Sequence, residues 1–89
     1  MLNCRFGGGI YIVVGFVLIH VSPKSEYKVY NELSRVLEVT ELHTLFGGYD
    51  LVAKIEAEDY EKLGDIVLNK IRTIEGVIDT MTLMGTKFR

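Results

Sequence analysis

Two kinds of hydrophobic spacing alternate along the chain. The run from Ile10 to Val21 is rich in β-branched and aromatic residues, which predicts a strand. The segment after it predicts a helix with Ser22 as its N-cap and Pro23 as its first residue. That helix carries apolar side chains at helical spacing, at Tyr27, Tyr30, Leu33 and Leu37.

Two further strands, over residues 39–46 and 49–57, flank the pair Gly47-Gly48. Two glycines between strands predict a hairpin with a type I′ turn, because both central residues of that turn need a positive φ. If these two glycines form the whole loop, Glu41 lies opposite Lys54, and this opposite-charge pair supports the strand pairing.

From Asp59 the apolar residues return to helical spacing, and Gly76 is the expected stop. Residues 77–84 then supply a last strand, so the order is βαββαβ. An offset of 38 residues superposes the two halves, placing Val17 on Ile55 and Leu33 on Ile71. The pattern predicts an α+β, ferredoxin-like sandwich, an antiparallel sheet with two helices on one face.

Residues 10–89 are expected to form this single domain, preceded by a flexible leader over residues 1–9. The apolar run after Arg5 could also be the core of a signal peptide, but no small-residue cleavage site follows it and it is too short to span a bilayer. The single cysteine, Cys4, cannot form an internal disulfide, and no Cys/His spacing suits a metal. A reducing, cytoplasmic setting is therefore expected.

The alternation of side chains assigns each strand position to one face of the sheet. In the first strand the face without helices receives Val14, Phe16 and Leu18. Leaving these side chains in water would forgo ~1.5 to 3 kcal/mol each, so we expect a second subunit to cover them in a homodimer. Scattered exposed apolar residues are the alternative.

The hairpin residues divide between the same two faces. The helix side is expected to hold Leu42, Thr44, Phe46, Tyr49, Leu51, Ala53 and Ile55. The open side is expected to hold Asp50, Val52, Lys54 and Glu56.

Charge and motifs exclude some functions. The net charge is −2, with ten basic and twelve acidic residues and no long run of one sign, so direct DNA binding is not expected. No catalytic constellation, phosphate-binding loop, cofactor motif or metal motif is present. His20 and His43 are isolated and are the only residues that could support a small enzyme.

The stretches "ELHTLFGGYDLVAKIEAED" and "DIVLNKIRTIEGVIDTMTLM" resemble the effector-binding (RAM) domain of the Lrp/AsnC family. The matching features are Gly-x-Tyr-Asp-Leu before an alternating strand, a helix ending in Ile-x-x-Ile-x-Gly-Val, and then Thr-x-Thr, and they extend roughly from Gly15 to Met84. The family usually carries a helix-turn-helix before this domain, so the chain resembles a stand-alone form without one.

The resemblance implies an oligomeric regulatory domain in transcription. It implies dimers formed through the sheets that assemble into octamers or decamers, with full-length Lrp/AsnC regulators as further partners and no cofactor. It also implies an amino-acid ligand between dimers, near the hairpin residues Gly47 to Asp50. The family often has threonine just before the first glycine, where this chain has Phe46.

The chemistry of an amino-acid site can be stated from the residues. Asp50 could accept the ammonium, while the backbone N–H groups beside Gly47 and Gly48 and the hydroxyls of Thr80 and Thr82 could donate to the carboxylate. Tyr49 completes this set of six candidate residues.

A purely structural interpretation of each candidate stays open: turn glycines, a solvated aspartate, a core tyrosine and strand-forming threonines. Side-chain alternation puts Thr80 and Thr82 on the helix side and Asp50 on the open side, so we expect a shared site only between subunits. The sequence favours amino-acid sensing. A small dimeric α+β-barrel enzyme using His20 and His43, and a ligand-free assembly module, are the alternatives.

Overall fold

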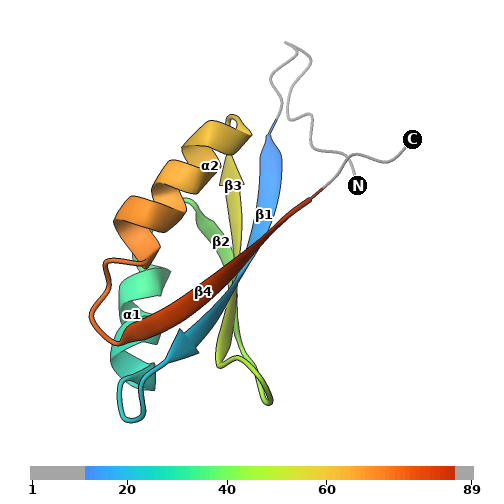
Figure 1. The fold of residues 1–89 in the computed structure, drawn as a ribbon. Helices are drawn as coiled ribbons and strands as arrows, with labels where there is room; N and C mark the ends of the chain where they lie inside the picture. Colours follow the sequence, from blue (N-terminus) through green and yellow to red (C-terminus); the bar gives the residue numbers. More distant parts are fainter. Residues whose placement is uncertain (1–11, 86–89) are drawn as a thin grey trace.

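The computed structural model describes residues 12–85, so the expected leader and the first residues of the first expected strand lie outside the described part. The described chain forms one antiparallel sheet with strand order β2-β3-β1-β4, and both helices pack on the same face of it (Figure 1). In chain order the elements are β1 (Val13–Val21), α1 (Glu26–Ser34), β2 (Val39–Thr44), β3 (Leu51–Ala57), α2 (Tyr60–Ile66), its π-helical continuation η1 (Val67–Ile71) and β4 (Val77–Met84). The expected βαββαβ ferredoxin-like order is confirmed.

The core lies between the helix layer and the two central strands, β1 and β3. Alternate residues of these strands are fully buried, as expected for a sheet that is covered on one side. The 38-residue offset holds in space, because equivalent positions of the two halves enter the same core. The buried set from both halves includes Val17, Ile55, Val29, Val67, Leu33 and Ile71.

Gly15 allows α2 to approach the sheet closely. A Cβ built on Gly15 would lie 2.9 Å from both Cδ atoms of Leu63, a fully buried side chain of α2. A larger residue at this position of β1 would therefore require the buried Leu63 side chain to shift.

The β2–β3 hairpin has the expected register but not the expected turn. Glu41 pairs with Lys54, and the Lys54 Nζ lies 3.6 Å from a Glu41 carboxylate oxygen. The strands stop at Thr44 and Leu51, and of the two central glycines only Gly47 has a positive φ, 129°. The connection is thus a wider loop and not a type I′ turn, which requires positive φ at both positions.

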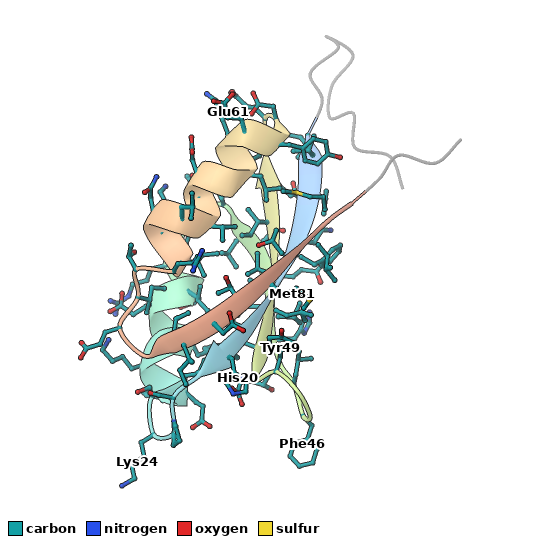
Figure 2. All side chains as sticks on the ribbon, in the orientation of Figure 1. His20, Lys24, Phe46, Tyr49, Glu61 and Met81 are labelled. Carbon is teal, nitrogen blue, oxygen red and sulfur yellow. The ribbon has the colours of Figure 1, made fainter. Side chains whose placement is uncertain are left out.

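Phe46 was wrongly assigned to the helix side of the hairpin. Because the loop opens before this residue, its side chain is fully exposed and points away from the sheet (Figure 2). Strand alternation applies only while the ladder continues, and here β2 ends at Thr44, with only the Leu45 N–H to Asp50 carbonyl hydrogen bond beyond it.

Helix α1 begins three residues later than the expected Pro23 start. Ser22 to Ser25 form a turn closed by the Ser25 N–H to Ser22 carbonyl hydrogen bond of 3.0 Å, with Lys24 at φ 75°. Pro23 therefore occupies the second position of a turn of type II character, where its fixed φ is equally suitable. Helix α1 ends at Ser34, so the expected apolar stripe is only partly correct. Val29 and Leu33 are buried, whereas Tyr27 and Leu37 are exposed.

The second helix begins as expected, and the Asp59 carboxylate accepts the Lys62 N–H at 2.8 Å as its N-cap. It changes to π geometry at Val67 and ends at Ile71, before the expected stop at Gly76. Gly76 has φ 107° in the following turn, and a Cβ there would come within 2.8 Å of Ser25. No helix within residues 12–85 is long and apolar enough to span a membrane.

An ion pair connects the second helical segment to the start of β2. Lys70 donates to both carboxylate oxygens of Glu38, at 3.0 and 3.1 Å. These hydrogen bonds hold the pKa of Glu38 below its usual value. The Lys70 side chain is exposed, so this ion pair lies at the surface.

The close approach at Gly15 can be tested with a glycine pair. Gly15→Ala is expected to lower the free energy of unfolding by about 1 to 3 kcal/mol, because the added methyl group contacts the buried Leu63. Gly64→Ala, in α2, is the matched control. Nothing lies within 4 Å of its Cβ position, so alanine should stabilise the helix by roughly 0.5 to 1 kcal/mol. Urea denaturation measures the free energy of unfolding of both variants, and equal effects of the two substitutions would contradict the close packing at Gly15.

The Glu38–Lys70 pair predicts a pH dependence of stability. Glu38→Gln, Lys70→Gln and the double variant should give a coupling energy of about 0.2 to 1 kcal/mol at neutral pH, a modest value because both groups are partly in solvent. The folded pKa of Glu38 lies below the unfolded value near 4.5, so this stability is present above pH 4.5 and is lost as the pH falls through the folded pKa. Urea denaturation at a series of pH values measures the coupling, and a constant coupling down to strongly acid pH would contradict the assignment.

Candidate functional site

Asp50 lies where the ladder between β1 and β3 ends. Its backbone N–H donates to the Ile19 carbonyl at 2.9 Å, and its Oδ2 accepts the Val21 N–H at 2.8 Å. The side chain is 32% exposed, so one carboxylate edge is bonded to the backbone while the group still reaches solvent. Asp50 is thus part of the fold, and it is neither a freely solvated turn residue nor simply directed to the open face.

His20 holds the glycine loop against the end of β1. Its Nδ1 lies 3.1 Å from the Gly48 carbonyl oxygen and 4.0 Å from the Asp50 carboxylate. The Tyr49 ring packs edge-on against the imidazole, with the ring centroids 6.0 Å apart (Figure 2). Tyr49 was expected in the helix-side core, but this contact places it beside His20, which the alternation of β1 puts on the open face.

A groove of about 580 Å³ separates α1 from the hairpin, within the ~300 to 1,000 Å³ range of small-molecule sites. Two carboxylates lie in an otherwise largely apolar wall, and no cationic side chain is among the described lining residues. The lining residues are Glu26, Tyr27, Tyr30, Thr44, Leu45, Asp50 and Leu51.

The sequence predicted Tyr27 and Tyr30 as members of the apolar stripe of the first helix, and Glu26 and Leu45 were not among the candidate site residues. The spacing of Glu26, Tyr27 and Tyr30 places all three on one side of α1. This shared side is the feature of the sequence that could have indicated a common binding surface. The groove itself depends on the hairpin opening beside that helix, which no local pattern indicates.

The glycine loop leaves space for a ligand near its backbone. A Cβ on Gly47 or Gly48 would meet no atom within 4 Å. Gly47 needs to be glycine for its φ of 129°, whereas Gly48 has no positive φ. The structure therefore brings Gly47, Gly48, Tyr49 and Asp50 together in one loop.

Thr80 and Thr82 lie apart from that loop. They pair with Ile19 and Val17 across the ladder between β1 and β4, and they face the helices as expected. They line a second groove, of about 260 Å³, together with Arg72, a residue that sequence reasoning did not select. The described residues of this single chain thus do not join Asp50 and the threonines in one cavity.

The two histidines have separate surroundings. His43, on β2, contacts the Glu41 carboxylate at 3.2 Å, and this hydrogen bond, with nearby Lys54, holds the pKa of Glu41 below its usual value. His20 instead contacts the glycine loop. Neither histidine is among the described residues that line these two grooves, and the two histidines have different partners.

The helix-free face of the sheet carries a continuous apolar patch. Its members are Val14, Phe16, Leu18, Val52, Met81 and Leu83, which the strand register makes neighbours. Phe16 is 40% exposed and Leu83 49%, in the middle and at the edge of the sheet. The face assignment of Val14, Phe16 and Leu18 is therefore confirmed.

Comparison with known proteins places this fold in a family. Residues 14–87 match the family model described as the Lrp/AsnC ligand binding domain. An uncharacterized HTH-type transcriptional regulator of Pyrococcus horikoshii, PH1916, is 36% identical over 73 residues, which are 79% of this chain and 49% of that protein. The chain thus spans about half the length of the curated relatives it matches.

Two solved structures share the architecture. TTHA0845 from Thermus thermophilus superposes with a TM-score of 0.81 and 31% identity, over 86% of this chain and 96% of that one. Escherichia coli AsnC superposes with a TM-score of 0.80 and 28% identity, over 85% of this chain and 52% of AsnC. Since the family model covers most of the chain and the fold agrees, the chain belongs to the Lrp/AsnC family, and the matched residues form its ligand-binding domain.

Proposed function

We propose that the chain senses an amino acid through the hairpin loop and transmits binding through its oligomeric assembly to transcription. The observation that carries this proposal is the position of Asp50 at the wall of the groove between α1 and the hairpin. Relatives that are transcriptional regulators support the regulatory role.

The loop offers a charged partner for a ligand's ammonium group. Asp50 uses Oδ2 for the Val21 N–H, and its other carboxylate oxygen remains for a charge-assisted hydrogen bond. The apolar wall formed by Tyr27, Tyr30 and Leu45 suits the aliphatic or aromatic part of an amino acid. Backbone N–H groups beside Gly47 and Gly48 are the nearest candidate donors for its carboxylate.

A second subunit completes the proposed assembly. The apolar patch of Phe16 and its neighbours would be covered by the same patch of another copy, forming a dimer through the sheets. Dimers would assemble further into octamers or decamers, in which Thr80 and Thr82 of one subunit could approach Asp50 of another. We place this assembly in the cytoplasm, acting with full-length family regulators and without direct DNA binding by this domain.

Asp50 substitutions separate folding from sensing. Asp50→Asn keeps an oxygen acceptor for the Val21 N–H but removes the charge, so stability should remain close to that of the unchanged protein while ligand affinity falls about tenfold or more. Asp50→Ala should lose binding and also about 1 to 3 kcal/mol of stability, because the Val21 N–H loses its acceptor. Calorimetry with the twenty amino acids at millimolar concentration, paired with urea denaturation, measures both effects.

Asp65→Asn, on the exposed side of α2, is the control and should change neither the ligand affinity nor the stability. A ligand present at 100 times its dissociation constant should stabilise the protein by about 2.7 kcal/mol. If no amino acid binds or stabilises the unchanged protein, the sensing proposal is wrong and a ligand-free assembly module remains.

The dimer has its own test. Phe16→Glu should convert the dimer to monomer at micromolar concentration, because a carboxylate in the middle of the patch would lose its hydration in an apolar interface. The folded monomer should survive, since Phe16 is 40% exposed and already faces Lys54. Leu37→Glu, at an 88% exposed residue outside the sheet, is the control and should leave the dimer intact. Analytical ultracentrifugation reports the mass, and an unchanged dimer in the Phe16 variant would exclude this face as the interface.

A further inference from the structure

The groove between α2–η1 and β4 has a composition unlike that of the groove beside Asp50. Thr80 and Thr82 form its floor on β4, while Gly64, Val67 and Leu68 line the helical side. Arg72 and Met84 complete the lining. β4 is an edge strand of the sheet, and the helices cover one face of that sheet (Figure 1).

The π turn determines where Arg72 lies. The Arg72 N–H donates to the Val67 carbonyl at 2.9 Å, five residues back, which is the π pattern. A π turn contains about one residue more than an α turn, so the residues after it are rotated by roughly 100° relative to an uninterrupted α-helix. Val67 and Ile71 both remain buried across this turn, and the next residue, Arg72, lines the groove over β4.

The Arg72 guanidinium has no anionic partner among the described residues. Four lysines of the described chain form salt bridges: Lys28, Lys54, Lys62 and Lys70. Within residues 12–85, Arg72 forms no salt bridge, and no carboxylate is among the described residues that line the groove.

Two hydroxyl donors lie in the same groove. No hydrogen bond within the described residues engages the side chain of Thr80 or Thr82, so both hydroxyls are free to donate. One delocalised cation with two hydroxyls is a donor set suited to a carboxylate or phosphate, and a guanidinium can bind either in a bidentate manner.

We propose that this groove is an oxyanion site, in which Arg72 supplies the charge and Thr80 and Thr82 supply hydrogen bonds. Its occupant is the carboxylate or phosphate group of a small molecule, and the open groove predicts millimolar affinity for the isolated anion. The site is separate from the Asp50 groove in one chain, so it goes beyond the proposed function.

Arginine side-chain NMR tests the site directly. The protein labelled with ¹⁵N is titrated with acetate and, separately, with inorganic phosphate, at ionic strength held constant with chloride. The Nε–Hε signal of Arg72, assigned by its loss in Arg72→Gln, should shift in a saturable manner. The signal of Arg35, an exposed arginine outside the groove, should not saturate.

Substitutions show whether the groove itself holds the anion. In Thr80→Val and Thr82→Val, which keep the shape and the strand preference, the apparent dissociation constant should rise threefold or more. In Arg72→Gln the anion-dependent shifts of the Thr80 and Thr82 backbone amides should disappear. Arg35→Gln is the matched control and should leave them unchanged.

Each outcome decides the proposal. Saturation by acetate alone identifies a carboxylate site, and saturation by phosphate alone identifies a phosphate site. Equal, non-saturating shifts of Arg72 and Arg35 would mean screening only and would overturn the oxyanion site. Because the readout is Arg72 and not amino-acid binding at Asp50, this failure is distinguishable from failure of the proposed sensing function.

Discussion

Burial on only one face of the sheet is the constraint on which the structure depends. The central strands β1 and β3 alternate fully buried residues with residues on the helix-free face, and both helices lie on the same side. This arrangement gives an 89-residue chain one compact core, and it also leaves an apolar patch around Phe16 with no covering layer among the described residues. Close packing on the covered side favours glycine at position 15, and incomplete covering on the other side favours association.

The candidate binding loop is built on the termination of the same central strands. The Asp50 backbone N–H donates to the Ile19 carbonyl, and the Asp50 carboxylate accepts the Val21 N–H. His20 contacts the Gly48 carbonyl oxygen through Nδ1. A functional group positioned in this way has little freedom, which favours recognition because less entropy is lost on binding. The same arrangement couples function to stability, since the carboxylate proposed to bind the ligand also satisfies a backbone N–H of β1.

Local sequence patterns predicted the structure correctly where a residue pairs with another nearby in the chain, or where buried and exposed residues alternate regularly. The hairpin register followed from the glycine pair and from Glu41 opposite Lys54, and the bounds of β4 followed from its alternation. Patterns failed where two conformations suit the same residue. Proline fixes φ equally well in a first helical turn and in a β-turn, so Pro23 did not reveal that α1 begins at Glu26. The glycine pair permitted a type I′ turn without requiring it, and only Gly47 uses its freedom.

The sequence by itself determined the element order, the buried faces of β1 and β3, the family resemblance and the presence of Asp50 in a glycine-rich loop. These depend on periodicity and on residue chemistry, which are local properties. Only the tertiary structure decided that Asp50 shares a groove with Glu26 and Tyr30, and that Arg72 shares one with Thr80 and Thr82. Both groupings join residues from separate elements, and the second includes Arg72, which directly follows the π turn. Such contacts arise from packing between elements, which hydrophobic spacing does not encode.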